Sequence, residues 1–368
     1  MQKRNEGGLP LEDSDPEIIE EEESTAEGHP QSFWERRRKV MIASALSLIL
    51  VFNAGYLAIG WQIYSTLAVA RSGCGDGCHN TPDNFNQSWG SDKWSDFNYE
   101  DYWMSNYENV TFKGGDDGIT LSAWWITANE SGDAGEAPTV IVVHGLRSNK
   151  YEHGMLVVAG MLHNAGINAL VVDMRDHGDS TEEDGRVSIG IKEYRDVMAS
   201  VDWLIDEKGI PEERIGLFGA SMGAGTSSIA FGMDNRIQSV VLDNGYLDLD
   251  VIIREELARE GYPTWLASAC VWSAYLFAGE ALLEPAPSVA FENHYDRPIF
   301  VIHGEMDDRV LPHHSRDMVA LGEQTGANVS SWFIEDTGHG EAKMTYPEEY
   351  SEKVTGFFLD TLHGTPSG

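Results

Sequence analysis

Positive charge is scarce in this chain. Only 25 lysine and arginine residues stand against 60 aspartate and glutamate residues, which gives a formal net charge of −35 over 368 residues, and nine of the cations are lysines. Because contacts with nucleic-acid phosphates need cations, this balance excludes a protein that binds nucleic acid through a general basic surface. An acid-rich, lysine-poor surface suits solubility at high ionic strength, where salt screens the repulsion between its charges.

Apolar material, by contrast, is plentiful. Hydrophobic residues make up 42% of the sequence, which is enough for a sizeable core at this length, so a mostly disordered chain is excluded. Residues 1–39 are the exception, because the acidic run from Glu17 to Glu27 has too few apolar residues to fold. We predict that they form a disordered, acidic tail.

The tail ends in four cations at positions 36–39, and no charged residue then occurs before Arg71. Residues 40–61 are predicted to form a transmembrane helix, because about 20 apolar residues cross a hydrocarbon core of roughly 30 Å. Trp34 and Trp61 flank this span, as aromatic residues do at membrane interfaces. The excess of cations before the span predicts a single-pass protein of the cell membrane, with a cytoplasmic N-terminus and an exterior remainder.

A cleaved signal peptide is the alternative to an anchor, because Ala68-Val69-Ala70 has the small-x-small pattern of a cleavage site. The apolar stretch is longer than a signal core, and a long acidic tail precedes it, so the uncleaved anchor is favoured. A buried soluble helix is disfavoured by the unbroken apolar run behind a basic flank. Residues 62–109, whose later part is rich in Asn, Asp, Ser, Trp and Tyr, are predicted to form an exterior stalk.

The chain has three cysteines. Cys74 and Cys78 lie in a Cys-Gly-Asp-Gly-Cys-His segment on the predicted exterior side, where disulfides persist, so a small disulfide loop is the preferred interpretation. A zinc site that also uses His79 is the alternative, but no fourth ligand is evident. Cys270 lies in an apolar helical stretch and is predicted to be a buried thiol.

From residue 110 onward, short β-branched apolar runs alternate with helical stretches such as Ile191–Glu207. This alternation predicts an α/β domain with a mostly parallel central sheet and helices on both of its faces. The predicted strands are Ile119–Ile126, Thr139–Val143, Ala169–Val172, Ile215–Phe218, Val240–Leu242 and Ile299–Ile302.

Residues 219–223 read Gly-Ala-Ser-Met-Gly, directly after the strand that ends at Phe218 and before a helical run of small residues. A sharp turn from strand to helix lifts the Ser221 hydroxyl above the sheet, and side chains two positions away on either side would collide with neighbouring backbone. The N-terminus of the new helix stabilises negative charge there. Ser221 is therefore a candidate nucleophile, although an isolated match of this kind is often only a glycine-rich packing loop.

A nucleophilic serine needs a base, and the base needs an orienting acid, each in a loop at the carboxyl end of a strand. Asp307 follows one predicted strand within His-Gly-Glu-Met-Asp, and His339 follows the next within Thr-Gly-His-Gly. Asp308 is the alternative acid, but the His-Gly-x-x-Asp spacing favours Asp307. The chain order Ser, Asp, His is the one expected for the fold in which this turn occurs.

Together these motifs resemble those of the α/β-hydrolase superfamily over about residues 110–364. His144-Gly145-Leu146, after the strand Thr139–Val143, resembles the His-Gly-x oxyanion segment of that superfamily. Residues 173–180 read Asp-Met-Arg-Asp-His-Gly-Asp-Ser and resemble its Asp-x-Arg-Gly-His-Gly-x-Ser segment, except that Asp176 replaces the usual glycine.

The resemblance implies an α/β-hydrolase fold with a catalytic triad of Ser221, His339 and Asp307. It also implies an oxyanion hole formed by the backbone N–H groups of Leu146 and Met222. Neither a metal nor an organic cofactor is required by this machinery.

Other histidines have simpler explanations. His144, His177 and His303 belong to turns of the superfamily type and are predicted to be structural. His313 and His314 are a possible metal pair, but nothing at ligand spacing completes a site, so they are predicted to flank the following helix.

An insertion of about residues 246–292 separates two of the predicted strands and reads as helical, with several Trp, Tyr, Phe and Leu residues. In this position the resemblance implies a small helical cap over the active site. So much aromatic and aliphatic surface suits an acyl or other apolar substrate.

The layout of a membrane span followed by a compact hydrolase most resembles the lipase, acylglycerol hydrolase and depalmitoylase branches. It implies a membrane-anchored serine hydrolase that cleaves carboxylic esters or thioesters, with a small-molecule or lipid ester as substrate. A serine peptidase of the same fold is one alternative, because the same machinery cleaves amides. A non-catalytic, membrane-tethered binding module is another, although such proteins usually lack a triad member. The sequence does not define the oligomeric state.

Overall fold

The computed structural model describes residues 32–70, 73, 79–87, 92–128 and 134–362. They belong to two compact units, Met1–Asn53 and Ala54–Gly368. Residues 1–31 of the predicted tail and the predicted disulfide between Cys74 and Cys78 lie outside the described residues.

The first helix, α1, runs over Phe33–Leu67. It is longer at both ends than the predicted span 40–61, because arginine and lysine are good helix formers and nothing in residues 62–67 breaks a helix. Among the described residues, α1 is the one helix long and apolar enough to cross a membrane, with a mean hydropathy of 2.0 over an 18-residue stretch. A signal sequence near the N-terminus can meet the same criteria of length and composition.

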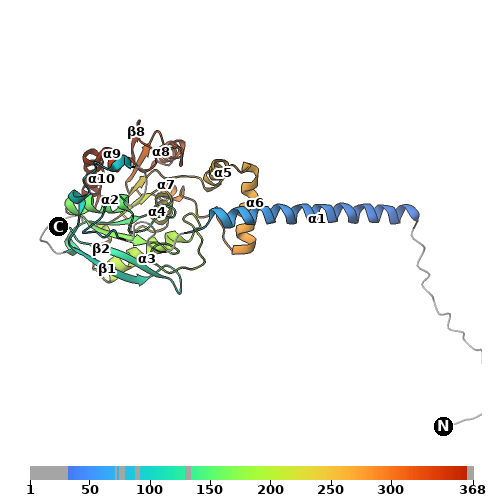
Figure 1. Ribbon diagram of the computed structural model, residues 1–368, viewed down its shortest axis with the longest axis horizontal. Coiled ribbons are helices and arrows are strands. Elements are labelled where there is room, and N and C mark those ends of the chain that lie inside the picture. Colours follow the sequence, from blue (N-terminus) through green and yellow to red (C-terminus); the bar gives the residue numbers. More distant parts are fainter. Residues whose placement is uncertain (1–31, 71–72, 74–78, 88–91, 129–133, 363–368) are drawn as a thin grey trace, which may run out of the picture. The chain divides into compact units, whose positions relative to one another are not determined.

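An eight-stranded sheet forms the centre of the second unit (Figure 1). The strand order is β1-β2-β4-β3-β5-β6-β7-β8, in which β1 and β4 each pair with β2 antiparallel and the remaining neighbours are parallel. The mostly parallel sheet that the sequence predicts is therefore confirmed. The strands are β1 Tyr107–Lys113, β2 Thr120–Ile126, β3 Thr139–Val143, β4 Asn168–Asp173, β5 Ile215–Ala220, β6 Ser239–Asp243, β7 Ile299–Gly304 and β8 Val329–Ile334.

Every residue of the five strands from β3 to β7 is buried, as expected of parallel strands covered on both faces. The predicted strands match β2 to β7 to within about two residues, and β3 has the predicted bounds. The sequence predicts no strand at β1, which begins inside the predicted stalk. Only Phe112 of β1 is buried, so this antiparallel edge strand has no continuous apolar run.

Successive residues of a strand pack into two different hydrophobic cores. Ile141 and Val143 of β3 belong to one core, whereas Val140 and Val142 belong to the other, because side chains alternate between the faces of a sheet. Residues of α3, α4 and α8 contribute to the first core, and residues of α2 and α10 to the second. These helices are α2 His153–Asn164, α3 Glu193–Asp206, α4 Met222–Met233, α8 His313–Thr325 and α10 Pro347–Thr361.

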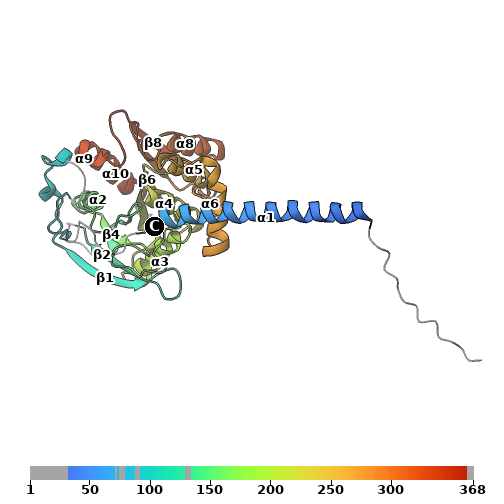
Figure 2. The same ribbon diagram turned by 45° about the vertical axis from the view of Figure 1, so that its right-hand side comes forward.

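The segment between β6 and β7 contains the helices predicted for the cap at residues 246–292. In Figure 1 and Figure 2 alike, α6 runs across the end of α1 that belongs to the same unit as the sheet. The cap elements are α5 Leu249–Arg259, a 3₁₀ turn Thr264–Leu266, α6 Ala267–Ser273, a π-helical turn Ala274–Ala278 and α7 Val289–Glu292.

The chain that follows α1 pairs with the domain at once. The N–H of Ala70 donates to the carbonyl of Gly185 (2.9 Å), and the N–H of Val187 donates to the carbonyl of Ala68 (2.7 Å). Further on, Phe85 and Met104 are buried in the core beside α2. Over its described residues, the predicted stalk 62–109 is therefore part of the hydrolase body.

Candidate active site

Ser221 lies in the turn between β5 and α4, at the carboxyl edge of the sheet. Its backbone has φ 56° and ψ −119°, a conformation that residues other than glycine rarely adopt. The surrounding backbone holds it there: the Ser221 N–H donates to the carbonyl of Asp243 (2.8 Å), and its carbonyl accepts from the N–H of Ala224 (2.9 Å). The turn predicted from Gly-x-Ser-x-Gly is present.

The two glycines of this motif are needed for space. A Cβ at Gly219 would lie 2.3 Å from the carbonyl oxygen of Gly223, and a Cβ at Gly223 would lie 2.2 Å from the carbonyl oxygen of Val143. Because backbone atoms cannot move aside as a flexible side chain can, larger residues at either position would distort the turn. This collision is the one that the sequence motif predicts.

Asp307 and His339 meet at the same edge of the sheet, after β7 and β8. The Nδ1 atom of His339 lies 2.7 Å from Oδ2 of Asp307. The other carboxylate oxygen, Oδ1, accepts from the N–H groups of Arg309 (2.9 Å) and Val310 (3.0 Å). Asp308, the alternative acid, is exposed, whereas Asp307 is buried, so the geometry favours Asp307 as the partner of the histidine.

Asp307 is held in its ionised form. Burial alone would raise the pKa of its carboxyl group, but the hydrogen bonds from His303 and His339, and the backbone N–H of Arg309, hold that pKa well below the usual range. An ionised carboxylate beside Nδ1 favours the tautomer of His339 with its proton on that nitrogen and leaves Nε2 free to accept one.

A fourth residue of this group escapes the sequence analysis. Asn244 follows β6, and its side-chain Nδ2 donates to Oδ2 of Asp307 (2.6 Å). Its backbone has φ 52°, which asparagine tolerates better than most residues, and its N–H donates to the carbonyl of Ile302 (2.9 Å). The only sequence signal is a polar Asp-Asn-Gly directly after a buried strand. Asn244 fixes the orientation of the Asp307 carboxylate.

The structure does not join all three predicted triad members. Asp307 and His339 are hydrogen-bonded, but no hydrogen bond links His339 to the Ser221 hydroxyl within the described residues. Both side chains project from loops at the carboxyl edge of the sheet, and hydrogen bonds of this kind are often long until substrate is bound.

The predicted oxyanion segment lies against the serine. A Cβ at Gly145 would be 3.3 Å from the Ser221 Cβ and 3.8 Å from its Oγ. The N–H of Leu146, and that of Met222 at the start of α4, donate no hydrogen bond within the described residues. Both donors are therefore available to an acceptor next to Ser221.

Two of the predicted structural histidines support these loops. His144 is fully buried between the carbonyl of Gly145 (2.8 Å from Nδ1) and the N–H of Met174 (3.2 Å from Nε2). Burial, reinforced by the neighbouring His177, lowers the pKa of His144 to about 3, so its ring stays neutral. His303 lies between the Ser315 hydroxyl and the carbonyl of Val310.

Asp176 stands where the superfamily pattern has glycine, and the structure shows why it is tolerated. It adopts the left-handed conformation that the glycine supplies, with φ 61°. Its Oδ1 accepts the N–H groups of Glu183 (2.8 Å), Asp184 (3.0 Å) and Gly185 (2.8 Å). The carboxylate thus organises the loop that pairs with Ala70 after α1.

The pair His313 and His314 gains a third polar partner from the cap. Glu255 of α5 lies 2.7 Å from Nε2 of His313 and 3.0 Å from Nε2 of His314, and these ligand-type atoms all lie within 4.8 Å of one another. Hydrogen bonds to Glu255 and Asp317 raise the pKa of His313 against the effect of burial. The sequence does not reveal Glu255, because it comes from a distant element. The hydrogen bonds of Glu255 to the two histidines join α5 of the cap to α8.

A cavity of about 120 Å³ has Ser221 in its wall, and most of its lining is apolar. Leu146 and Met222 lie beside the serine, Ile253 and Leu257 come from α5 of the cap, and Leu67 comes from the end of α1. A dry cavity of about 150 Å³ accommodates one benzene ring. This conformation therefore has room for a short acyl segment next to the serine, and a longer chain requires the cap to move.

Residues 154–365 match the model of the prolyl oligopeptidase family, peptidase family S9. The chain belongs to this family. This chain shares the α/β-hydrolase fold with a Pyrococcus furiosus esterase, which is 27% identical with a TM-score of 0.56 over 77% of this chain and 98% of that one. The family and this esterase make the chain a serine hydrolase.

More distant structures agree on the fold. An acylaminoacyl peptidase of Pyrococcus horikoshii is 17% identical with a TM-score of 0.55, over 72% of this chain and 43% of that one. Est1E of Butyrivibrio proteoclasticus, solved with ferulic acid bound, is 18% identical with a TM-score of 0.54, over 69% and 100%. In a comparison of sequences alone, an uncharacterised Mycobacterium tuberculosis protein is 24% identical over 245 residues, which are 67% of this chain and 77% of that one.

Proposed function

We propose that this serine hydrolase cleaves carboxylic esters or thioesters with apolar acyl groups, and that α1 anchors it in the cell membrane. The observation that carries the proposal is the position of Ser221 in the wall of an apolar cavity. Two unused backbone donors lie in the adjoining segments, and the hydrogen-bonded Asp307–His339 pair lies at the same carboxyl edge of the sheet. An acyl chain fits such a cavity, whereas a charged or strongly polar group would lose its hydration there.

In the proposed mechanism, Nε2 of His339 takes the proton of the Ser221 hydroxyl as its oxygen attacks the carbonyl carbon. Asp307 stabilises the imidazolium that results, and the N–H groups of Leu146 and Met222 donate to the oxyanion. The tetrahedral intermediate collapses, and His339 gives its proton to the departing alcohol or thiol. Water then attacks the acyl-enzyme by the same sequence, which releases the acid and restores Ser221.

A fluorophosphonate probe tests the nucleophile. We expect the full chain to be labelled and the Ser221→Ala variant to remain unlabelled, because only an activated serine forms the adduct. Ser227, a buried serine of α4, offers a matched control, and Ser227→Ala should keep labelling. A folded wild-type chain that the probe does not label would favour a binding module instead.

A peptidase is the second candidate, and the family match favours it, because that family is described by its oligopeptidases. Hydrolysis rates on two sets of substrates distinguish the two functions: p-nitrophenyl esters of increasing acyl length, and aminoacyl p-nitroanilides. We expect hydrolysis of the esters, with kcat/KM rising along the short acyl chains that the cavity accommodates, as apolar surface is buried. Hydrolysis of the anilides alone would assign the peptidase function.

The proposed topology places the N-terminus in the cytoplasm and the hydrolase body outside, because the cations at 36–39 precede the apolar helix. Protease added to intact cells should therefore digest the body while leaving the N-terminal segment protected. A body that is digested only after the membrane is permeabilised has the opposite orientation. A mature chain that begins near residue 71 would show that α1 is a cleaved signal sequence.

A further inference from the structure

The cap carries an apolar surface that the proposed reaction does not use. Residues 264–278 contain no charged residue, in a chain in which 23% of residues are charged. Five large apolar side chains of this segment are between 54% and 59% exposed. We call them the apolar cap face: Trp265, Trp272, Tyr275, Leu276 and Phe277.

The distribution of side-chain size across this segment is the reverse of that in a helix packed against a core in water. Its buried residues are mostly small, such as Ala267, Ala269 and Ala274, while the aromatic residues point outward. A helix that is apolar all round is normally buried in protein or lipid, and a contiguous apolar patch on a soluble surface marks an interaction site. The exposed face of this segment is therefore suited to contact with an apolar environment, such as lipid or another protein surface.

Four contacts fix this segment to one stretch of α1. The rings of Tyr56 and Trp265 stack at 5.9 Å, and the Tyr56 hydroxyl donates to the carbonyl of Trp265 (3.0 Å). The hydroxyl of Ser273 donates to the carbonyl of Leu57 (2.8 Å). Trp61 meets the ring of Phe277 edge to face at 5.6 Å.

Gly60 is what permits the helices to approach so closely. A Cβ at this position would lie 2.3 Å from the carbonyl oxygen of Ala269. Small residues allow two helix backbones to approach closely in the same way in membrane proteins. The crossing point of α6 on α1 is therefore set at residue 60.

That crossing point coincides with the end of the predicted span. The charge-free run begins at Val40, and about 20 helical residues cross the hydrocarbon core, which places residue 60 at the exterior boundary. Trp and Tyr concentrate at this depth because their rings are apolar and their N–H and O–H groups reach water. Trp265, Trp272 and Tyr275 of the apolar cap face are residues of this type.

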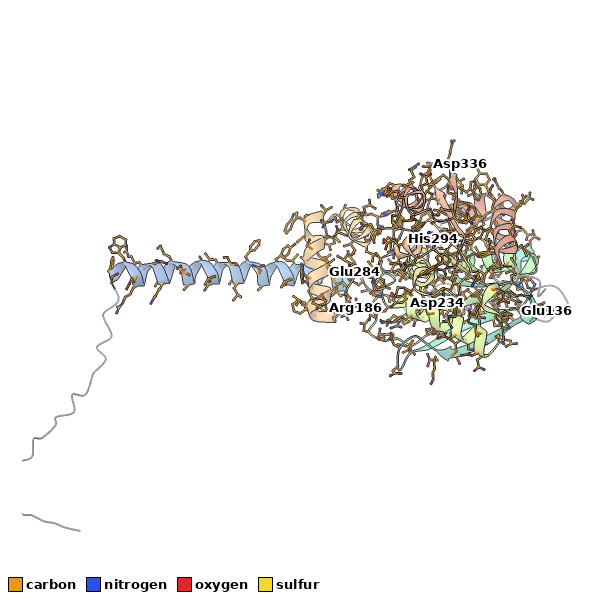
Figure 3. The ribbon with its side chains drawn as sticks, turned by 180° about the vertical axis from the view of Figure 1, so that it is seen from behind. Glu136, Arg186, Asp234, Glu284, His294 and Asp336 are labelled. Carbon is orange, nitrogen blue, oxygen red and sulfur yellow. The ribbon has the colours of Figure 1, made fainter. Side chains whose placement is uncertain are left out.

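The active-site cavity continues from the same place. About one and two turns beyond the crossing, Tyr64 and Leu67 of α1 line the cavity that contains Ser221, together with Cys270 of α6. Figure 3 shows Arg186 and Glu284 on the side of the body that carries α6, at the opposite end from Glu136. The guanidinium of Arg186 lies over the Trp61 ring, 5.3 Å from its centroid, so the polar body begins directly beside this level.

We propose that the apolar cap face lies in the outer interface of the bilayer, and that the cavity takes its substrate from there: the ester of a lipid whose aliphatic chain is embedded in the membrane. This substrate class rests on the proposed ester hydrolysis at Ser221. The position of the cap in the bilayer rests on the proposed membrane anchoring by α1, on the exposed residues and on their contacts with α1.

The kinetic experiment uses the full chain reconstituted in phosphatidylcholine vesicles. The variant Trp272→Ser/Tyr275→Ser/Leu276→Ser removes three exposed side chains, none of which has a hydrogen bond or ring contact with α1 among the described residues. Tyr295→Ser, which changes another exposed residue before β7, is the control. Rates are measured on p-nitrophenyl palmitate in the vesicles and on water-soluble p-nitrophenyl butyrate. We expect the triple variant to lose about tenfold on palmitate through weaker interfacial binding, to be unchanged on butyrate, and the control to be unchanged on both.

Equal rates of the triple variant and wild type on vesicle-borne palmitate would overturn the proposal, and so would parallel losses on both esters. A second measurement needs no catalysis: brominated phosphatidylcholine should quench tryptophan emission more strongly in wild type than in Trp272→Phe. Equal quenching would place the cap outside the bilayer, even if both esters are hydrolysed. Quenching as expected without any ester hydrolysis would keep the membrane surface and reject the lipid ester. A triple variant that changes only the oligomeric state would assign the face to a second copy.

Discussion

The hydrolase body and the cap treat apolar side chains in opposite ways. In the body, the central strands are buried at every residue, and the surface is acidic. In the segment 264–278, the small residues are buried and the large aromatic ones are exposed. The same tendency of apolar surface to leave water explains both arrangements only if the cap does not face water.

The two regions also differ in how they use charged residues. The body buries several cations with acidic partners: Lys150 lies 3.0 Å from Asp173, and the guanidinium of Arg175 lies 2.7 Å from Asp196. Removing one partner from such a pair leaves a buried charge alone, which is costly. The structure of the body therefore depends on keeping both partners of these buried ion pairs. The apolar segment of the cap has no charged residue, and its position depends on its crossing with α1 and on the apolar environment that it contacts.

Asp307→Asn provides the largest expected effect on the body. Because asparagine cannot stabilise the imidazolium and also allows the wrong tautomer of His339, we expect kcat for ester hydrolysis to fall by about 10⁴-fold. Asp308→Asn is the matched control and should keep nearly full activity, since Asp308 is exposed. Steady-state kinetics on a soluble ester give both numbers. A larger loss at Asp308 would reassign the acid.

Asn244→Gly tests the residue that positions the acid. Glycine accepts the backbone conformation at φ 52°, so this variant removes the amide that bonds to Asp307 without adding strain. We expect kcat to fall by about tenfold with little change in KM, because the orientation of the acid is loosened while the cavity is unaltered. A change confined to KM would show that Asn244 contacts substrate instead.

Gly60→Ala tests the cap side of the comparison. Its Cβ would collide with the Ala269 backbone, so we expect the free energy of unfolding to fall by about 1–3 kcal/mol. Gly55→Ala lies on the same helix with no atom within 4 Å of the new Cβ, and it should be neutral or slightly stabilising. Thermal unfolding in detergent compares the two. Equal behaviour would mean that α6 does not cross α1 at Gly60.

The smallest effect concerns acid stability. The folded-state pKa of Asp307 lies below its ordinary value of 3.8, so the stability that its charge contributes is fully present above that value and is lost as the pH falls toward the folded pKa. Any stability advantage of wild type over Asp307→Asn should be constant between about pH 7 and pH 5 and should shrink below about pH 4. Denaturant unfolding at several pH values measures it. An advantage that grows in acid would contradict the bonding described for Asp307.

The sequence predicts the parts of this molecule that depend on local patterns. The strand Thr139–Val143 is found with the predicted bounds because it is a continuous apolar run, and the turn at Ser221 is found because its glycines are required for space. Asn244 and Glu255 are not predicted, because their roles depend on partners from distant elements. The outward-facing cap residues are also missed, since a run of apolar residues does not indicate which side faces out.

A structure of the full chain labelled with an alkyl fluorophosphonate tests the central claim most directly. The account predicts phosphorus bonded to Ser221 Oγ, a phosphonyl oxygen about 2.7–3.1 Å from the N–H groups of Leu146 and Met222, and the alkyl chain directed toward Leu67 and Cys270. An adduct on another residue, or an alkyl chain that points away from α1, would contradict it.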